Sequence, residues 1–361
     1  MKRYRILAVI SLLSMTLLAT QAVGVAEAVR FEDPNLEYVI RDALDSWLGA
    51  IDDSELLTIK TIIATKQDIR DLSGLEHCVN ATFLDLGYNA VTDIASIAQL
   101  SGLSFLSLYE NHVSDISPLA ALTELRIVWL DSNEITDISS LAGSTKLAGV
   151  YLKGNLLQDI SALAGLPEIK ILDLTYNAIE NVEALSGLTE LQRLRLFGNP
   201  IADLSPLAAL TSVFELTLGT LAEEAATVDL TPILGLEKLS RLLISSIELP
   251  TLEPLRHLEY LNELNILRAG LTDISTVSAL TRIRLLGLSG NPIEDISPLL
   301  DLPNLEIVWL LDIGAERNDG SPAADVIAAL EAGGVMVILS EDDADDLEFG
   351  PLVPGGAKYT P

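Results

Sequence analysis

The apolar residues of this chain recur with a period of 22 residues. In the stretch 103–124, LSFLSLYENHVSDISPLAALTE, apolar side chains fall at fixed places on either side of Asn111. Copies of this stretch begin at Ile59, Ala81, Leu103, Leu125, Leu147, Ile169, Leu191, Val213, Leu239, Leu261, Ile283 and Leu305. Each start follows the last by 22 residues, except that Leu239 follows Val213 by 26. A fixed period of this length predicts a solenoid in which each copy forms one coil.

The repeats contain a Leu-x-Leu pair, such as Leu106-Ser107-Leu108, or another apolar pair with the same spacing. This alternation predicts a short strand whose two leucines point inward and whose middle residue points outward. Strands of successive coils would lie side by side in one parallel sheet. The outward strand residues would then form a continuous surface that the core does not dictate.

An asparagine follows the second leucine of the pair by three residues in most repeats. The asparagines in this place are Asn89, Asn111, Asn133, Asn155, Asn177, Asn199 and Asn291. A side-chain amide both donates and accepts hydrogen bonds, so stacked asparagines can satisfy backbone groups that the turn leaves unpaired. We therefore expect a structural asparagine ladder inside the coil.

The units over residues 213–282 depart from this pattern. Leu221, Ile247 and Ala269 stand where the ladder asparagine is expected, and the first of these units carries an insertion around residues 223–226. We expect either a change in curvature, a looser segment, or a more apolar turn of equal rigidity.

Two flanks of the repeats have the pattern of caps. Before the repeats, Asp33 is a good helix N-cap and Pro34 suits the first turn. The residues that follow at helical spacing are Leu36, Val39, Ile40, Ala43, Leu44 and Trp47, and they predict an amphipathic helix whose apolar face packs on the first coil and seals it. After the repeats, Ser321 and Pro322 predict a helix that runs to about Ala332, and residues 335–339 predict a closing strand.

The repeated phrase DISPL, at residues 115–119 and 295–299, resembles the 22-residue bacterial class of leucine-rich repeats, of which the internalins are the best known. Residues 31–36 and 40–44 resemble the helical cap that precedes such repeats in exported bacterial proteins. The resemblance implies an α/β solenoid: a curved right-handed coil with a parallel sheet on its concave face and short helical turns on its convex face. It also implies adhesion or host-surface recognition.

The predicted division of the chain is a signal peptide (1–28), an N-terminal helical cap (29–58), leucine-rich repeats (59–318), a C-terminal helix-strand cap (319–340) and an acidic tail (341–361). The first segment has a basic start, an apolar run over residues 6–20 and the small-residue motif Ala26-Glu27-Ala28, which is typical of a cleaved secretory signal. Retention of this segment as a membrane anchor is the alternative. We expect no membrane span after its removal, and a disordered tail.

Charge and cysteine content fit export. The formal net charge of −30 disfavours binding to nucleic acid. The single cysteine, Cys78, allows no intrachain disulfide, so stability must come from the stacked core. We expect Cys78 to be a small buried residue.

The sequence offers little for catalysis or metal binding. His77, His112 and His257 lie in different repeats, without the spacing of a triad or a metal site. Aspartates recur before the Ile-Ser turn, at Asp71, Asp93, Asp115, Asp137, Asp159, Asp203, Asp273 and Asp295. A calcium ladder is one explanation, but one carboxylate per coil suits capping of short helical turns better. We predict no enzyme, no metal and no cofactor.

Aromatic side chains gather at the outward strand positions. The full set is Phe83, Tyr88, Phe105, Tyr109, Trp129, Tyr151, Tyr176, Phe197 and Trp309, and among them stand Ile127, Asp131, Lys153, Ile171, Asp173, Arg193 and Arg195. Exposed aromatics beside arginine are typical of protein-binding hot spots. The predicted ligand contacts are Phe105, Tyr109, Trp129, Asp131, Tyr151, Lys153, Tyr176, Arg195, Phe197 and Trp309.

These features predict a secreted or cell-surface-associated, non-catalytic and monomeric protein that binds a protein ligand on its concave face. A glycan ligand stacked on the aromatic rings is the alternative within the same surface. A structural or carbohydrate-binding protein of the cell envelope, and an accessory domain of an enzyme encoded elsewhere, are the alternatives from other classes. The large side chains of neighbouring coils could also simply cover one another.

Overall fold

The computed structural model describes residues 28–221, 226–314 and 320–340. The signal peptide predicted over residues 1–28 lies outside this part of the chain except for Ala28, and the predicted acidic tail lies wholly outside it. Of the predicted insertion, only Ala226 is described.

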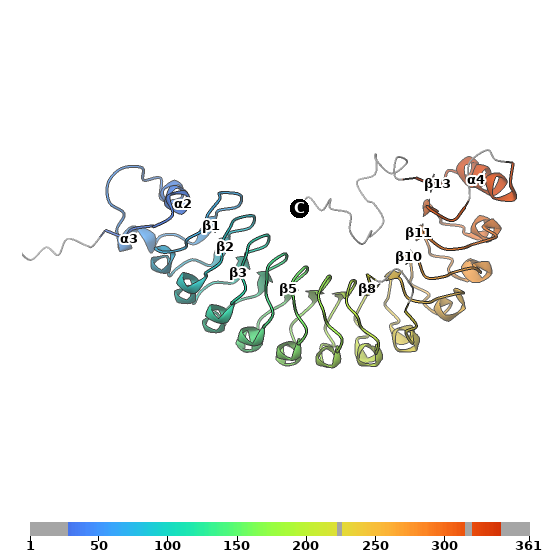
Figure 1. The fold of residues 1–361 in the computed structure, drawn as a ribbon, viewed down its shortest axis with the longest axis horizontal. Coiled ribbons are helices and arrows are strands. Elements are labelled where there is room, and N and C mark those ends of the chain that lie inside the picture. Colours follow the sequence, from blue (N-terminus) through green and yellow to red (C-terminus); the bar gives the residue numbers. More distant parts are fainter. Residues whose placement is uncertain (1–27, 222–225, 315–319, 341–361) are drawn as a thin grey trace, which may run out of the picture.

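The described chain forms a curved solenoid with one parallel sheet on its inner side (Figure 1). Within the described residues the sheet has 13 strands, which follow one another in sequence order. The strands are β1 (Thr61–Ile63), β2 (Phe83–Asp85), β3 (Phe105–Ser107), β4 (Ile127–Trp129), β5 (Gly149–Tyr151), β6 (Ile171–Asp173), β7 (Arg193–Arg195), β8 (Glu215–Gly219), β9 (Arg241–Ser245), β10 (Glu263–Leu267), β11 (Leu285–Gly287), β12 (Ile307–Trp309) and β13 (Met336–Ile338). The predicted leucine-rich-repeat solenoid is therefore confirmed.

Short 3₁₀ helices form the outer side of the arc (Figure 1). They are η1 (Leu75–His77), η2 (Ala95–Gln99), η3 (Ser117–Ala121), η4 (Ser139–Gly143), η5 (Ser161–Gly165), η6 (Glu183–Leu185), η7 (Ser205–Ala209), η8 (Thr231–Gly235), η9 (Glu253–Leu255), η10 (Ser275–Ala279) and η11 (Ser297–Asp301). The repeat aspartates precede these helices. Asp115 Oδ1, for example, accepts a hydrogen bond of 2.8 Å from Ser117 N, and this bond lowers the pKa of the Asp115 carboxyl.

The core lies between the sheet and the outer helices. Leu106 and Leu108 of one repeat are both completely buried, as are their counterparts Val128 and Leu130 in the next. The residue between each pair points to the concave face, because side chains alternate along a strand.

The seven asparagines of the predicted ladder make one shared set of hydrogen bonds. Asn133 Oδ1 accepts from Val113 N at 2.9 Å, and Asn133 Nδ2 donates to Leu108 O at 2.8 Å and Leu130 O at 3.1 Å. The same three partners, at the same sequence offsets, surround each of the other six. Each amide therefore joins two coils through their backbones.

Asn133→Ala should lower the free energy of unfolding by about 1–3 kcal/mol, because it leaves the buried Val113 N–H without an acceptor. Denaturant unfolding of the variant and the parent chain measures the difference. Asn304→Ala is the matched control, since the Asn304 amide donates to Thr281 O at an exposed site. An unchanged midpoint for Asn133→Ala would contradict a structural role of the ladder.

The N-terminal cap differs in part from its prediction. Helix α2 (Pro34–Leu44) begins after Asp33, whose Oδ1 accepts from Asn35 N at 2.9 Å and whose Oδ2 accepts from Arg70 N at 2.7 Å. The helix ends at Leu44, because Asp45 takes a left-handed conformation with φ of 49°. The prediction that Trp47 continues the packed face is therefore wrong.

Trp47 instead packs on the outer face of the cap. Its ring centroid lies 5.1 Å from that of Tyr38, and the two side chains are 47% and 57% exposed respectively. Ala43, also predicted on the packed face, is exposed. A short helix that the sequence did not predict, α3 (Asp53–Leu56), completes the cap.

The C-terminal cap forms as the sequence predicts. Helix α4 (Pro322–Ala332) begins after Ser321, whose hydroxyl accepts from Ala324 N, and Gly333 caps its end. Strand β13 then pairs with β12 and closes the sheet.

The irregular units keep the sheet continuous. Strands β8, β9 and β10 are each five residues long, and they pair over their full lengths. Ile247 and Ala269, which replace ladder asparagines, are buried, whereas Leu221 is 67% exposed. The more apolar turn is thus the alternative that the structure favours at two of the three positions.

Candidate functional site

Three rows of side chains cover the concave face. The first row contains the first strand residues, such as Phe105, and the central row contains the third, such as Ser107. The third row lies two residues further on, as at Tyr109. Parallel pairing in register aligns each row from coil to coil, so that Ser107 stands beside Trp129 and Trp129 beside Tyr151.

Four aromatic rings from successive coils form a contiguous cluster, here called the aromatic stack. Tyr88, Tyr109, Trp129 and Tyr151 have ring centroids separated by 4.6, 4.9 and 5.4 Å in that order. Lys66 Nζ lies 4.6 Å from the centroid of the Tyr88 ring. Beside the stack, the rings of Phe83 and Phe105 lie parallel at 4.2 Å. The first half of the concave face is therefore an aromatic surface.

Asp131 fixes the central ring of the stack. Its Oδ2 accepts from Trp129 Nε1 at 2.6 Å, and its Oδ1 accepts from Lys153 N at 2.8 Å. One carboxyl group thereby holds an indole ring and links β4 to the next coil. Burial, together with the nearby Asp173, raises the pKa of Asp131 to about 7, although these hydrogen bonds oppose the shift.

A network of ion pairs occupies the middle of the concave face. Glu215 Oε1 accepts from Arg195 Nε at 2.8 Å and from Arg195 Nη2 at 2.6 Å, and Arg195 Nη1 lies 3.3 Å from Asp173 Oδ2. Arg193 and Arg241 lie 3.6 and 3.7 Å from the other oxygen of Glu215. Three guanidinium groups thus surround one buried carboxylate.

The structure brings most of the predicted ligand contacts together. Phe105, Tyr109, Trp129, Asp131, Tyr151, Tyr176 and Arg195 are half-buried on the concave side, and Lys153 is exposed. The guanidinium group of Arg195, however, is bonded to Asp173 and Glu215. Arg195 therefore stabilises the concave face itself.

Two of the predicted contacts are buried, and the prediction that they are exposed is wrong. Phe197 is 5% exposed, because its ring packs against the Tyr176 ring and over Gly219. Gly219 has no side chain that would keep the Phe197 ring away from the backbone. Trp309 is 3% exposed and stands in the central row between Gly287 and Ile338. The strand of the C-terminal cap, β13, gives Trp309 a packed neighbour that the repeat pattern alone does not show.

Glu215 is the important residue that the sequence prediction missed. It is a carboxylate on the concave face with 2% exposure. The repeat register contained a signal for it, since Glu215 pairs with Arg193 in the preceding strand and with Arg241 in the following one. A lone glutamate between two arginines across three coils indicates an ion-pair network.

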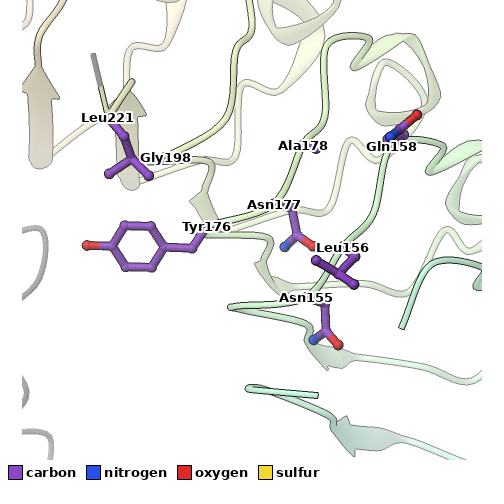
Figure 2. A pocket seen from close by; sticks show the side chains of 8 residues that line it. All are labelled: Asn155, Leu156, Gln158, Tyr176, Asn177, Ala178, Gly198 and Leu221. Carbon is purple, nitrogen blue, oxygen red and sulfur yellow. The ribbon is translucent and has the colours of Figure 1, made fainter. Parts of the chain in front are cut away.

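A shallow hollow of about 300 Å³ lies at the edge of the sheet, where the strands end (Figure 2). Its lining residues are Asn155, Leu156, Gln158, Tyr176, Asn177, Ala178, Gly198 and Leu221. Leu156 is 57% and Leu221 67% exposed, and Tyr176 connects the hollow with the concave face. Its lining contains no acid, base or thiol that could act in catalysis.

His77, His112 and Cys78 have local surroundings that explain them without catalysis. His77 Nδ1 lies 2.6 Å from Asp53 Oδ1 and so connects η1 to α3, while His112 lies 3.4 Å from Glu134. Burial raises the pKa of the Cys78 thiol to about 12, so this thiol stays protonated. Residues 28–221, 226–314 and 320–340 contain no group of three or more histidine, cysteine or acidic side chains placed to hold a metal ion.

The same ranges contain no helix of the length and apolarity that crossing a bilayer requires.

Family comparisons agree with the fold. A leucine-rich-repeat profile matches residues 145–201, and a profile of two leucine-rich-repeat copies matches residues 101–143. A comparison with curated protein sequences gives no match.

Solved structures give stronger likenesses. The chain is 31% identical to the internalin inlF of Listeria monocytogenes, with a TM-score of 0.77, and the match covers 86% of this chain and 90% of that one. It is 20% identical to a leucine-rich-repeat protein of Leptospira interrogans, with a TM-score of 0.68 and coverage of 78% and 73%. It is also 20% identical to the ectodomain of the Arabidopsis thaliana receptor kinase GASSHO1/SCHENGEN3, with a TM-score of 0.56 and coverage of 72% and 36%. The last two likenesses show the fold alone.

Proposed function

This chain belongs to the internalin-like leucine-rich-repeat proteins of bacteria, and from that premise we propose that it is exported and binds a protein partner through the aromatic stack of its concave face. The aromatic stack carries the proposal. Large aromatic side chains dominate the energetics of protein interfaces, and the rings of the stack, of which Tyr88 is exposed and the other three are half-buried, are already in contact with one another. Little side-chain freedom would be lost on binding.

The charges in the middle of the concave face largely balance one another. Asp173, Glu215 and Glu263 lie among Arg193, Arg195 and Arg241, so three carboxylates face three guanidinium groups. The chain as a whole carries a net charge of −30. The excess of negative charge therefore lies mostly elsewhere, and a partner of the concave face need not be basic.

The packing of the rings favours protein over glycan. A sugar ring stacks on the open face of an aromatic ring, but Trp129 has Tyr109 at 4.9 Å on one side and Tyr151 at 5.4 Å on the other. Its faces are thus occupied by neighbours. A tyrosine side chain carries both an apolar ring edge and a hydroxyl group, and this combination suits the mixture of apolar and hydrogen-bonding groups on a protein surface.

Site-specific photocrosslinking tests this proposal. Tyr109 is replaced with p-benzoylphenylalanine, and the purified chain is irradiated in separate mixtures of bacterial surface proteins, animal cell-surface proteins and soluble glycans. We expect a protein adduct of one discrete mass. The matched control carries the same photoreactive group at Thr123, an exposed position after the outer helix η3.

The two positions separate the outcomes. An adduct that forms at Tyr109 but not at Thr123 supports a protein partner on the concave face. Adducts only at Thr123 would move the binding site to the helical side, and adducts only in the glycan mixture would favour the carbohydrate-binding alternative.

A further inference from the structure

The central row of the concave face collects buried polar atoms that lack hydrogen-bond partners. Six such side-chain atoms occur in the described residues, and five of them belong to central-row residues. Those residues are Ser107, Thr217, Asn265 and Trp309. Native proteins rarely bury polar groups without partners, so a concentration along one row calls for a physical explanation.

Asn265 and Trp309 are the two largest of these side chains. Asn265 is 1% exposed, and neither its Nδ2 nor its Oδ1 has a partner. Trp309 is 3% exposed, and its Nε1–H has none. Strand pairing places Asn265 beside Gly287, and Gly287 beside Trp309.

Gly287 provides the space for the asparagine amide. A Cβ atom at this position would lie 2.1 Å from Asn265 Oδ1. The amide therefore extends over the glycine, toward the strand that carries Trp309. Two hydrogen-bonding side chains thus share one short stretch of the row, with Leu243 and Ile338 next to it on either side.

An asparagine in this place should lower the stability of the fold, because its buried amide is unpaired. A ladder asparagine such as Asn133 satisfies both its amide atoms, whereas Asn265 satisfies neither. A leucine of similar size would suit the apolar neighbours and would bury no unpaired group. Residues that lower the stability of a fold in this way are found at functional sites, where their unpaired donors and acceptors bind a ligand.

We infer that Asn265 and Trp309 form a second ligand contact, which binds a main-chain amide of an extended peptide segment. This inference rests on the proposed function and names the group that the concave face recognises beyond the aromatic stack. A peptide amide offers a carbonyl oxygen to the Asn265 and Trp309 N–H donors and an N–H to Asn265 Oδ1.

The surroundings select a neutral group over an anion. The described side chains nearest in the row are apolar, and the first row next to Asn265 carries the half-buried carboxylate of Glu263, whose pKa is raised by burial. A carboxylate or phosphate would meet this acidic group and Asn265 Oδ1, and the neighbouring Arg241 guanidinium is already paired with Glu263 at 3.1 Å. Because the polar atoms are fully buried, contact requires the side chains that cover them to move.

The three tryptophans of the chain give a direct spectroscopic test. N-acetylglycine N-methylamide is titrated into the ¹⁵N-labelled chain, and the indole N–H signals are followed by NMR, with assignment by Trp309→Phe. We expect a saturable shift of the Trp309 signal only. Trp47 is an exposed control and Trp129 a control whose indole already binds Asp131. Acetate, as the charged probe, should leave all three signals in place.

Two variants complete the test. Asn265→Leu should raise the thermal unfolding midpoint by roughly 2–5 °C and abolish the Trp309 shift. Gly287→Ala should displace the amide without removing it and should also abolish the shift. A Trp309 signal that does not respond to the capped glycine overturns the inference. A lowered unfolding midpoint of Asn265→Leu also overturns it, because it would mean that the Asn265 amide stabilises the fold by bonding a buried water. Neither measurement involves Tyr109, so crosslinking at Tyr109 and this test can fail independently.

Discussion

Arg195→Met should lower the free energy of unfolding by about 3–5 kcal/mol, the cost of leaving buried charges without their partner. The Glu215 side chain is 2% exposed and the Asp173 side chain 8% exposed, and Arg195 bridges them. Arg193 and Arg241 stay at 3.6 and 3.7 Å from the far oxygen of Glu215, so they do not replace the two short bonds. Urea unfolding at pH 7 measures the loss.

A second substitution separates the loss of the ion pair from the loss of side-chain packing. Glu215→Gln, added to Arg195→Met, should recover much of the stability because it removes the orphaned charge. Arg284→Met is the matched control, since the Arg284–Glu306 pair lies at the surface and should contribute less than about 1 kcal/mol. If Arg195→Met proves as mild as Arg284→Met, the network is not structural.

Arg195 illustrates what the sequence could predict about this face. The period of 22 residues placed the residue correctly in an outward strand position, and every strand of the regular units could be located in the same way. The period does not say whether an outward side chain faces solvent or a neighbour. That depends on the residue 22 positions away, which for Arg195 is Asp173 on one side and Thr217 on the other.

Trp309 and Phe197 are aromatic examples of the same limit: the repeat period does not tell whether an outward side chain faces solvent. Both stand in outward positions, yet the Phe197 ring packs down over Gly219, and Trp309 is buried beside Ile338 of the C-terminal cap. Trp129 stands between Ser107 and Tyr151, without a glycine as cross-strand neighbour, and it remains half-buried. The exposure of a side chain on a repeat surface thus depends on its neighbours in the adjacent coils. The fold, by contrast, depends on the apolar pattern that each coil carries.

The cap shows a different reason for a failed prediction. Trp47 stands at helical spacing from the buried residues of α2, but the helix ends at Leu44. A single left-handed residue, Asp45, redirects the chain, and nothing in the apolar spacing signals that change of direction.

Trp129→Ala combined with Tyr151→Ala should weaken binding of the partner identified by crosslinking at least about 100-fold. Removal of two central aromatic anchors costs about 2 kcal/mol or more each, and each 1.4 kcal/mol is a factor of ten in affinity. The melting midpoint should change little, because both side chains are half-buried and lie outside the leucine core. Titration calorimetry measures the affinity, and thermal unfolding monitors the fold.

Tyr38→Ala combined with Trp47→Ala is the matched control for this double variant. It removes the same two residue types from another pair of contacting rings, which lie on the N-terminal cap and not on the concave face. Binding should persist in the control. If instead the concave variant unfolds, Trp129 and Tyr151 serve the structure, and the large side chains of neighbouring coils do no more than cover one another. If both double variants lose binding equally, the partner contacts aromatic side chains wherever they are exposed, and the concave face has no special role.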